Sequence, residues 1–362
     1  MNSTNDEDFT TCDDCKNPIE NCTCVCPFCG ERDKCECGLK LSNDDGAATG
    51  GWLVMVLDYS WLIGGPQGSG VDTAANIFSR VGAKLGYHVF GKREYHSNIK
   101  GLHSYFVVRL SRDNKVRSNV NGANFMVAFD AETMIRHGLE ILKDGVIIYD
   151  SSIVNTSIDE IPTIEVDHRV RLDEFFKSKN MEPKVSSIIE LAKERGVNVY
   201  PISFRDTLSN IADELKSPEL SRMTRMFNIL GVSFSLGVLK SPIEPLLDSI
   251  EEIFSKKPSI ADLNKKAANF AYNYASAKFS DFNRSLNQIE KEPNTMLVQG
   301  HQGSALGKIV CGCRFQSYYP ITPASDESEF LETHEILEVK ENRPGSTTIV
   351  QLRTKFLRLV WR

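Results

Sequence analysis

The sequence predicts an α/β protein whose main part is built around a parallel sheet. Short apolar runs bounded by turn residues recur between residues 59 and 203, helix-period patterns separate them, and a glycine-rich loop joins the first run to the first helix. Strands that alternate with helices pair in parallel, because each helix carries the chain back to the edge where the strand began. With 362 residues there is room for two or three domains, and 41% hydrophobic residues suffice for their cores.

The first predicted strand, residues 59–65, leads into a loop and then into a helix for which Asp72 is the expected N-cap. A strand, a glycine loop and a helix in this order form a phosphate-binding arrangement, because backbone N–H groups point at the anion. The alternative is a tight turn in which glycine only permits close packing. The candidate binding residues of this loop are Gly64, Gly65, Gly68 and Gly70.

The remaining elements of the large domain follow from the same periodicities. A helix over 131–142 stands between two strands in βαβ order, which predicts a Rossmann-like parallel sheet followed by a helical part. Residues 91–101 form a basic, glycine-ended loop that either contacts an anionic ligand or is solvated. None of the seven histidines has a catalytic or metal-ligand spacing. The further strands are expected at 104–111, 125–130, 145–150 and 197–203, and the further helices at 205–215, 218–239, 245–254 and 260–279.

Eight of the ten cysteines fall in the first 37 residues as one repeated unit, a CxxC followed by a CxC. Four thiolates per unit suit a tetrahedral zinc ion, and so short a segment needs metal to fold. Tandem zinc is the main interpretation; iron–sulfur clusters are the alternative, although the spacing matches no ferredoxin pattern. The predicted ligands are Cys12, Cys15, Cys22, Cys24, Cys26, Cys29, Cys35 and Cys37.

Charge and hydropathy exclude several classes of function. The net charge of −6 and the pI of about 5.8 give no reason to expect nucleic-acid binding. Residues 1–8 are polar and acidic, unlike a secretory signal, and the apolar run 52–63 is interrupted by Asp58 and too short for a bilayer. A soluble cytoplasmic protein without membrane or nucleic-acid partners is therefore expected.

A second candidate site lies near the C-terminus, where the sequence reads YPITPASDES. Two prolines stiffen this loop and restrict the residue before each of them to extended geometry. The loop therefore holds one hydroxyl, that of Thr322, in a fixed place next to Tyr319, Pro320 and Ile321. A short helix and a turn over 305–315 precede it, and such strand-to-helix loops are where α/β proteins bind ligands.

These segments together resemble the 2-oxoacid:ferredoxin oxidoreductases, thiamine-diphosphate enzymes that also use coenzyme A. WLIGGPQGSGVD at 61–72, REYHSNIKG at 93–101, FDAET at 129–133 and NILG at 228–231 resemble the family's γ domain, and YPITPASDES resembles the start of its α subunit in the fused archaeal arrangement. The resemblance covers residues 52–351. It implies a γ domain at 52–294 and the truncated start of an α-subunit pyrimidine-binding domain at 295–362. The metal module at 1–42 and the flexible linker at 43–51 follow from their own composition, and the cysteine module is not a feature of this family.

The resemblance also implies roles and partners. Thr322 would contact the 2-oxoacid substrate, such as pyruvate, beside the thiazolium of thiamine diphosphate, with Tyr319, Pro320 and Ile321 at the cofactor. The diphosphate–magnesium site and an iron–sulfur cluster would lie on a separate β subunit. Coenzyme A would be the co-substrate and ferredoxin the electron acceptor; the cofactor acts as electron sink while the protein positions it.

The last eleven residues, 352–362, depart from the family, which has an acidic helix after the strand at 347–351. Synonymous codons exist for this basic tail that, regrouped one base earlier, encode TEDEISAISMA, a family-like continuation with its acidic residue in place. We therefore expect a frameshifted tail, poor packing of residues 295–362, and no oxidoreductase activity of the chain even with a β subunit. The gene sequence tests the frameshift.

Two other functions are compatible with parts of the sequence. A zinc-bearing binding or regulatory module could use the α/β domain to dock on such an enzyme. A nucleotide-dependent dehydrogenase would rest on the glycine loop alone, and the absence of an acidic ribose partner argues against it.

Overall fold

The computed structural model describes residues 54–55, 58–66, 68–95, 103–216, 226–321, 325–339 and 343–351. The chain divides into two compact units, Met1–Val54 and Met55–Arg362, and the account below concerns the second. The eight N-terminal cysteines, Thr322 and the tail 352–362 lie outside the described residues, so the predictions made for them stay predictions.

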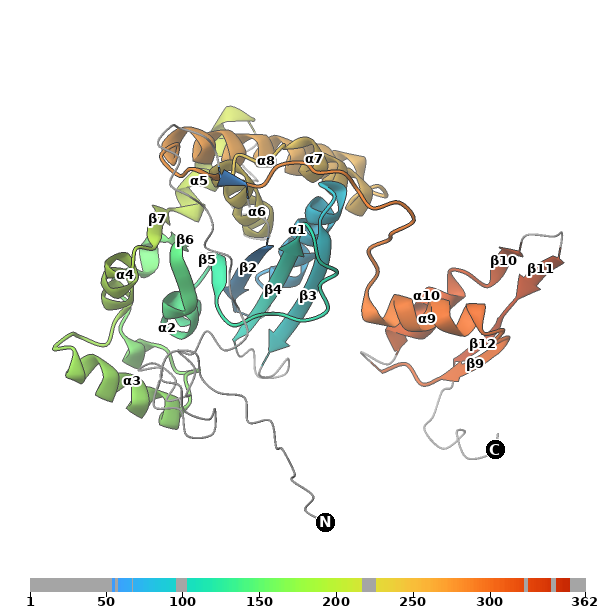
Figure 1. Ribbon diagram of the computed structural model, residues 1–362, viewed down its shortest axis with the longest axis horizontal. Coiled ribbons are helices and arrows are strands. Elements are labelled where there is room, and N and C mark those ends of the chain that lie inside the picture. Colours follow the sequence, from blue (N-terminus) through green and yellow to red (C-terminus); the bar gives the residue numbers. More distant parts are fainter. Residues whose placement is uncertain are drawn as a thin grey trace, which may run out of the picture. The chain divides into compact units, whose positions relative to one another are not determined.

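A six-stranded sheet forms the centre of the large domain (Figure 1), with strands in the order β3-β4-β2-β5-β6-β7. The ladders from β2 to β7 are parallel, and β4 runs antiparallel to both β2 and β3. The predicted α/β class with a mostly parallel sheet is confirmed. The bounds are β2 Asp58–Gly65, β3 His88–Tyr95, β4 Ser104–Ser111, β5 Ala123–Ala128, β6 Ile141–Asp150 and β7 Asn198–Ile202; β1 (Val54–Met55) and β8 (Arg284–Ser285) are short.

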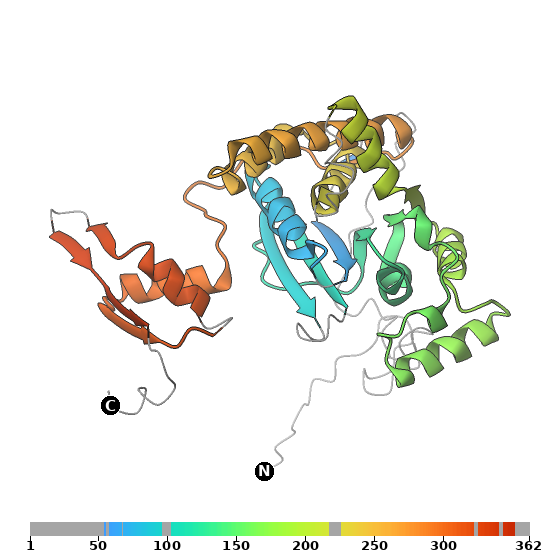
Figure 2. The ribbon, with the colours of Figure 1, turned by 180° about the vertical axis from the view of Figure 1, so that it is seen from behind.

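Helices cover both faces of this sheet (Figures 1 and 2). Strand residues alternate between the two cores: Trp61 and Ile63 of β2 join one, and Leu62 joins the other. The first core is closed by α1 (Val71–Lys84), α5 (Phe204–Glu214), α6 (Phe227–Val238), α7 (Glu244–Ile253) and α8 (Pro258–Lys278), and the second by α2 (Ala131–His137), α3 (Val166–Ser178) and α4 (Val185–Glu194).

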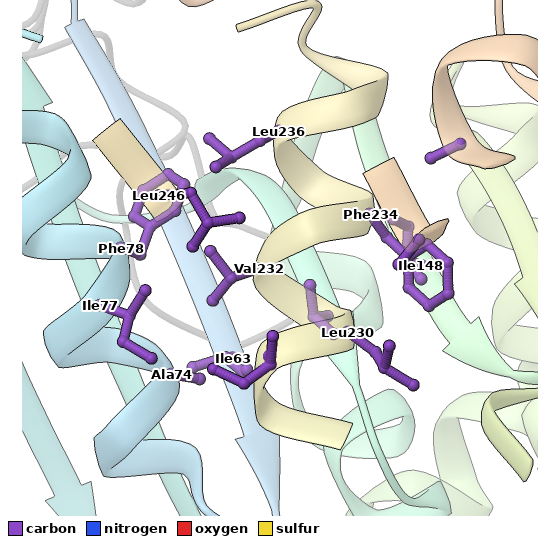
Figure 3. Close-up of a cluster of buried hydrophobic side chains, with 14 of the residues drawn as sticks. Ile63, Ala74, Ile77, Phe78, Ile148, Leu230, Val232, Phe234, Leu236 and Leu246 are labelled. Atoms are coloured by element: carbon purple, nitrogen blue, oxygen red, sulfur yellow. The ribbon is translucent and has the colours of Figure 1, made fainter. Parts of the chain in front are cut away.

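Helix α6 is buried along almost its whole length, because it lies between the sheet, α1 and α8. Figure 3 shows Leu230 and Val232 of α6 among Ile63 of β2 and Ile77 of α1. An apolar helix of this kind is a core element rather than an amphipathic surface helix. The apolar residues of α6 therefore serve core packing, and α6 lies within the helix predicted at 218–239.

Three predictions about local structure are wrong. Residues 91–95 belong to the edge strand β3, not to a loop. The helix predicted at 131–142 ends at His137, and the chain turns through the short helix η2 (Gly138–Glu140) into β6. The N-cap of α1 is Gly70, and Asp72 lies within the first turn.

The segment after residue 300 has small elements of its own. β9 (Phe315–Tyr318) pairs in parallel with β12 (Thr348–Gln351), and β10 (Ile336–Val339) pairs antiparallel with β11 (Arg343–Ser346). The predicted helix and turn at 305–315 correspond to α9 (Gly300–Val310), and α10 (Ser325–Glu332) packs against it. Most of the exposed large hydrophobic residues in the described part of the chain lie between residues 296 and 350, and Val166 and Val170 of α3 are the others; the predicted poor packing of 295–362 stays a prediction. The residues in the C-terminal segment are Met296, Leu297, Val298, Val310, Phe315, Ile321, Ile336 and Val350.

In the part of the chain that the structure describes, no helix combines the length and the apolar character needed to cross a bilayer.

Candidate anion-binding site

The carboxyl ends of β2 and β5 lie side by side, and the helices that follow them leave toward opposite faces of the sheet. Helix α1, after β2, packs in the core with α6, and α2, after β5, packs in the core with α4. Such a divergence of two neighbouring connections opens a crevice at the edge of the sheet, and open α/β sheets bind ligands there. The glycine loop lies at this edge.

Gly64 and Gly65 are packing glycines at the end of β2. A Cβ on Gly64 would lie 2.6 Å from Cγ2 of Thr133, and a Cβ on Gly65 would lie 2.9 Å from Oγ of Ser69 and 3.1 Å from Cβ of Phe129. Phe129 also donates its backbone N–H to the carbonyl of Gly64 at 3.1 Å. At these two positions the close-packing alternative is the better description.

Gly68 and Gly70 have a different role, because both adopt left-handed backbone, with φ of 86° and 91°. Open space surrounds Gly68, while a Cβ on Gly70 would lie 2.9 Å from Nδ2 of Asn228 on α6. Gly70 caps α1 without any side-chain hydrogen bond to the first turn. The N–H groups of that turn are thus available to an anion, and the helix dipole favours negative charge there.

One buried hydroxyl belongs to the same loop. The Oγ of Ser69 has no hydrogen-bond partner among the described residues. A buried polar group of this kind usually has a partner, because leaving it unsatisfied costs free energy. Ser69 is therefore a candidate donor to a bound anion.

In the neighbouring helix α2, a carboxylate of the chain already occupies the N-terminal turn. Asp130 accepts hydrogen bonds from the backbone N of Thr133 at 2.9 Å and from its hydroxyl at 2.6 Å. The carboxylate therefore satisfies the first turn of α2. Burial raises the pKa of Asp130, and the two hydrogen bonds from Thr133 lower it in part.

A positively charged side chain lies next to the first turn of α1. Arg93 on β3 contacts Asp72 with 3.1 Å between Nη1 and Oδ2, and both side chains are partly exposed. Burial raises the pKa of Asp72, and the charge of Arg93 opposes that shift. The predicted basic segment thus brings one guanidinium to the glycine loop, although as a strand.

The proline loop is described only in part. Tyr319, Pro320 and Ile321 follow β9. Ile321 donates its N–H to the carbonyl of Tyr319 at 2.9 Å, and the residue is 49% exposed. These residues form a turn that presents Ile321 outward. The four glycines of the first site meet at one edge, whereas the proline loop is part of the C-terminal segment.

Three residues at this edge were not named as candidates from the sequence: Ser69, Asp130, which caps α2, and Asn228, which closes on Gly70. Asp130 and Asn228 lie in the strand predicted at 125–130 and the helix predicted at 218–239, and in the family-like segments FDAET and NILG. The start of α2 at Ala131 was predicted, and an Asp directly before a predicted helix is a capping signal that could have identified Asp130. No local signal could have placed Asn228 beside a glycine more than 150 residues away.

The chain is similar to known proteins over most of its length. The family profile described as pyruvate ferredoxin/flavodoxin oxidoreductase matches residues 60–274. The α subunit of 2-oxoacid:ferredoxin oxidoreductase 1 from Sulfurisphaera tokodaii is 37% identical over 297 residues, which are 81% of this chain and 46% of that protein. The α subunit from Saccharolobus solfataricus is 38% identical over 298 residues, again 81% of this chain and 46% of that one.

A solved structure has a similar fold. The 2-oxoglutarate:ferredoxin oxidoreductase from Magnetococcus marinus, described with 2-oxoglutarate, coenzyme A and succinyl-CoA bound, superposes with a TM-score of 0.59 at 20% identity, covering 84% of this chain and 45% of that one. The chain spans about half the length of the curated relatives it matches. The family match and the relatives agree with the motifs read from the sequence, and the chain belongs to the pyruvate ferredoxin/flavodoxin oxidoreductase family.

Proposed function

We propose that the chain is a component of a 2-oxoacid:ferredoxin oxidoreductase and that its glycine loop binds the diphosphate of coenzyme A. The parent reaction is the oxidative decarboxylation of a 2-oxoacid to an acyl-CoA, carbon dioxide and reduced ferredoxin. The observation that carries the proposal is the open first turn of α1, which follows left-handed Gly68 and Gly70 at the point where two connections diverge.

The residues at this edge suit a diphosphate better than a neutral ligand. The N–H groups after Gly70 and the hydroxyl of Ser69 are donors, and Arg93 adds positive charge next to Asp72. The related enzyme from Magnetococcus marinus, which is described with coenzyme A bound, supports this choice of ligand.

The thiamine site is proposed on the resemblance alone. Thiamine diphosphate with magnesium would supply the electron sink for decarboxylation when bound between this chain and a β-type subunit. In this proposal Thr322 orients the 2-oxoacid by its hydroxyl, and Tyr319, Pro320 and Ile321 hold the loop against the cofactor. Because the magnesium site and the iron–sulfur cluster would belong to the β subunit, the isolated chain should reduce no ferredoxin.

Competition calorimetry tests the coenzyme A site without requiring turnover. Coenzyme A should bind the full chain with one-to-one stoichiometry, ADP should compete with it, and pantetheine, which lacks the diphosphate, should not. Displacement by pantetheine as effective as displacement by ADP, or no binding at all, would show that the glycine loop is not a diphosphate site.

A pull-down with the β subunit of an archaeal relative tests the assembly separately. We expect a stable complex. Failure to form one would contradict the role as an oxidoreductase component, but it would not affect the conclusion about coenzyme A binding. The alternative of a zinc-bearing regulatory module gains no support from the described residues, and tandem zinc at the N-terminal cysteines stays a prediction.

A further inference from the structure

Two buried histidines face each other at the same edge of the sheet. His103 directly precedes β4 and His137 ends α2, and their Nε2 atoms are 3.1 Å apart. The side chains are almost fully buried, with residue exposures of 1% and 6%. Two imidazole nitrogens at this separation either share one proton or direct two lone pairs at one cation.

Glu140 determines which nitrogen of His137 carries the proton. Its Oε2 lies 2.7 Å from Nδ1 of His137. A carboxylate accepts a hydrogen bond here, so Nδ1 donates and Nε2 holds a lone pair that points at His103. A carboxylate behind an imidazole is the arrangement that orients metal-ligating histidines in proteins.

The separation of the two imidazoles suits a metal ion. Zinc–nitrogen bonds are about 2.0–2.1 Å long, which places two nitrogen ligands of a tetrahedral ion about 3.3 Å apart. The observed 3.1 Å therefore needs only a small movement. A hydrogen bond between the two rings has a similar length. The groups around the two imidazoles must therefore distinguish a metal site from a hydrogen-bonded pair.

Two carboxylates lie beside His103. His103, Asp130 and Glu132 each offer a ligand atom, and these atoms lie within 4.8 Å of one another. Both oxygens of Glu132 are engaged, Oε1 by Nε of Arg136 at 2.8 Å and Oε2 by the hydroxyl of Thr163 at 2.5 Å. Asp130 accepts the two hydrogen bonds given above at Oδ1, which leaves Oδ2 as the carboxylate oxygen best able to bind an ion.

The charges of the cluster favour a cation. Arg136 is engaged by Glu132 and Glu165, the latter at 2.7 Å. A divalent ion between Asp130 and the imidazoles would offset the remaining negative charge.

We propose that His103 binds one borderline divalent cation such as Zn²⁺ together with His137, whose Nε2 is 3.1 Å from its own, and with Asp130, which offers a carboxylate oxygen on the other side within 4.8 Å. Two imidazole nitrogens and one carboxylate oxygen are the donor set that this class of ion prefers. The site is independent of the proposed coenzyme A site, because it uses neither the glycine loop nor the turn of α1. It also differs from the predicted zinc module, because it contains no cysteine.

Cobalt(II) absorption tests the site in the full chain. Alkylation first blocks the ten cysteines, none of which lies between residues 38 and 310, so thiolates cannot take up the probe. We expect one equivalent of Co²⁺ to give saturable visible bands and Zn²⁺ to displace it. His103→Gln and His137→Gln should abolish the bands, whereas His334→Gln, which changes an exposed histidine outside the cluster, should leave them unchanged.

A second variant keeps the test decisive if the buried histidine variants fail to fold. The side chain of Glu140 is 53% exposed, so Glu140→Gln should fold, as melting in the absence of metal will confirm. Loss of the orienting carboxylate should weaken Co²⁺ binding by about tenfold or more. Absence of bands in the wild-type chain, or equal affinity in Glu140→Gln, would overturn the proposal and leave the two imidazoles as a simple hydrogen-bonded pair.

Discussion

Replacing Gly70 by alanine should weaken coenzyme A binding strongly while the fold survives. The φ of 91° is unfavourable for any residue with a Cβ and costs about 1–2 kcal/mol, and the new Cβ would lie 2.9 Å from Nδ2 of Asn228. Relief of this strain must move the first turn of α1. A hydrogen bond from an N–H to a charged group contributes about 1.5–3 kcal/mol, so losing one corresponds to roughly 10- to 150-fold weaker binding.

The assay is calorimetric titration of coenzyme A into the wild-type chain and into two variants. Gly307→Ala is the matched control, because Gly307 lies in α9 with nothing within 4 Å of an added Cβ. Gly70→Ala should lose at least tenfold in affinity, and its free energy of unfolding should fall by about 1–2 kcal/mol. The reasoning fails if Gly70→Ala binds coenzyme A as tightly as Gly307→Ala does.

Three further predictions concern the large domain. Gly237→Ala should lower the free energy of unfolding by about 1–3 kcal/mol in urea denaturation, because its Cβ would lie 2.5 Å from a backbone carbonyl of α8; unchanged stability would contradict the close contact of α6 with α8. Ser235→Ala should cost about 1–3 kcal/mol in the same assay, since the buried Nε1–H of Trp61 donates to Oγ of Ser235 at 2.9 Å; a neutral result would mean that this bond is not formed. Burial raises the pKa of Tyr200 from 10.0 to about 12, so the folded state favours the protonated phenol. The stability that this protonated phenol contributes should be lost as the pH rises from 10.0 to about 12. Denaturation midpoints measured across this range should fall less in Tyr200→Phe, which keeps the stacking on Phe279, and equal falls in both proteins would contradict the assignment.

Strands β2, β5 and β6 could be predicted because they are largely buried on both faces. Residues 59–65 and 145–150 are nearly continuous apolar runs, as buried parallel strands are. β3 was missed because an edge strand exposes one side, and Lys92, Arg93 and Glu94 gave it the composition of a loop. Helix α3 had no prediction, and of its residues only Phe176 is buried, so its sequence carries little apolar periodicity.

The parts of the candidate site that lie in one continuous segment could be predicted. The parts that different strands and helices bring together could not. The glycine loop was predicted because strand, loop and helix are consecutive in the chain. The roles of the individual glycines could not be predicted, because they depend on residues from other elements. Gly64 and Gly65 pack against Thr133 and Phe129, and Gly70 lies against Asn228. The His103–His137 pair was missed for the same reason, since 34 residues separate two side chains that the ends of β4 and α2 bring together.

A crystal structure of the full chain with coenzyme A tests the central claim most directly. We predict density for the diphosphate at the first turn of α1, within hydrogen-bond distance of the backbone N–H groups that follow Gly70 and beside the hydroxyl of Ser69. Coenzyme A ordered elsewhere on the chain, with this turn facing only water, would contradict the account.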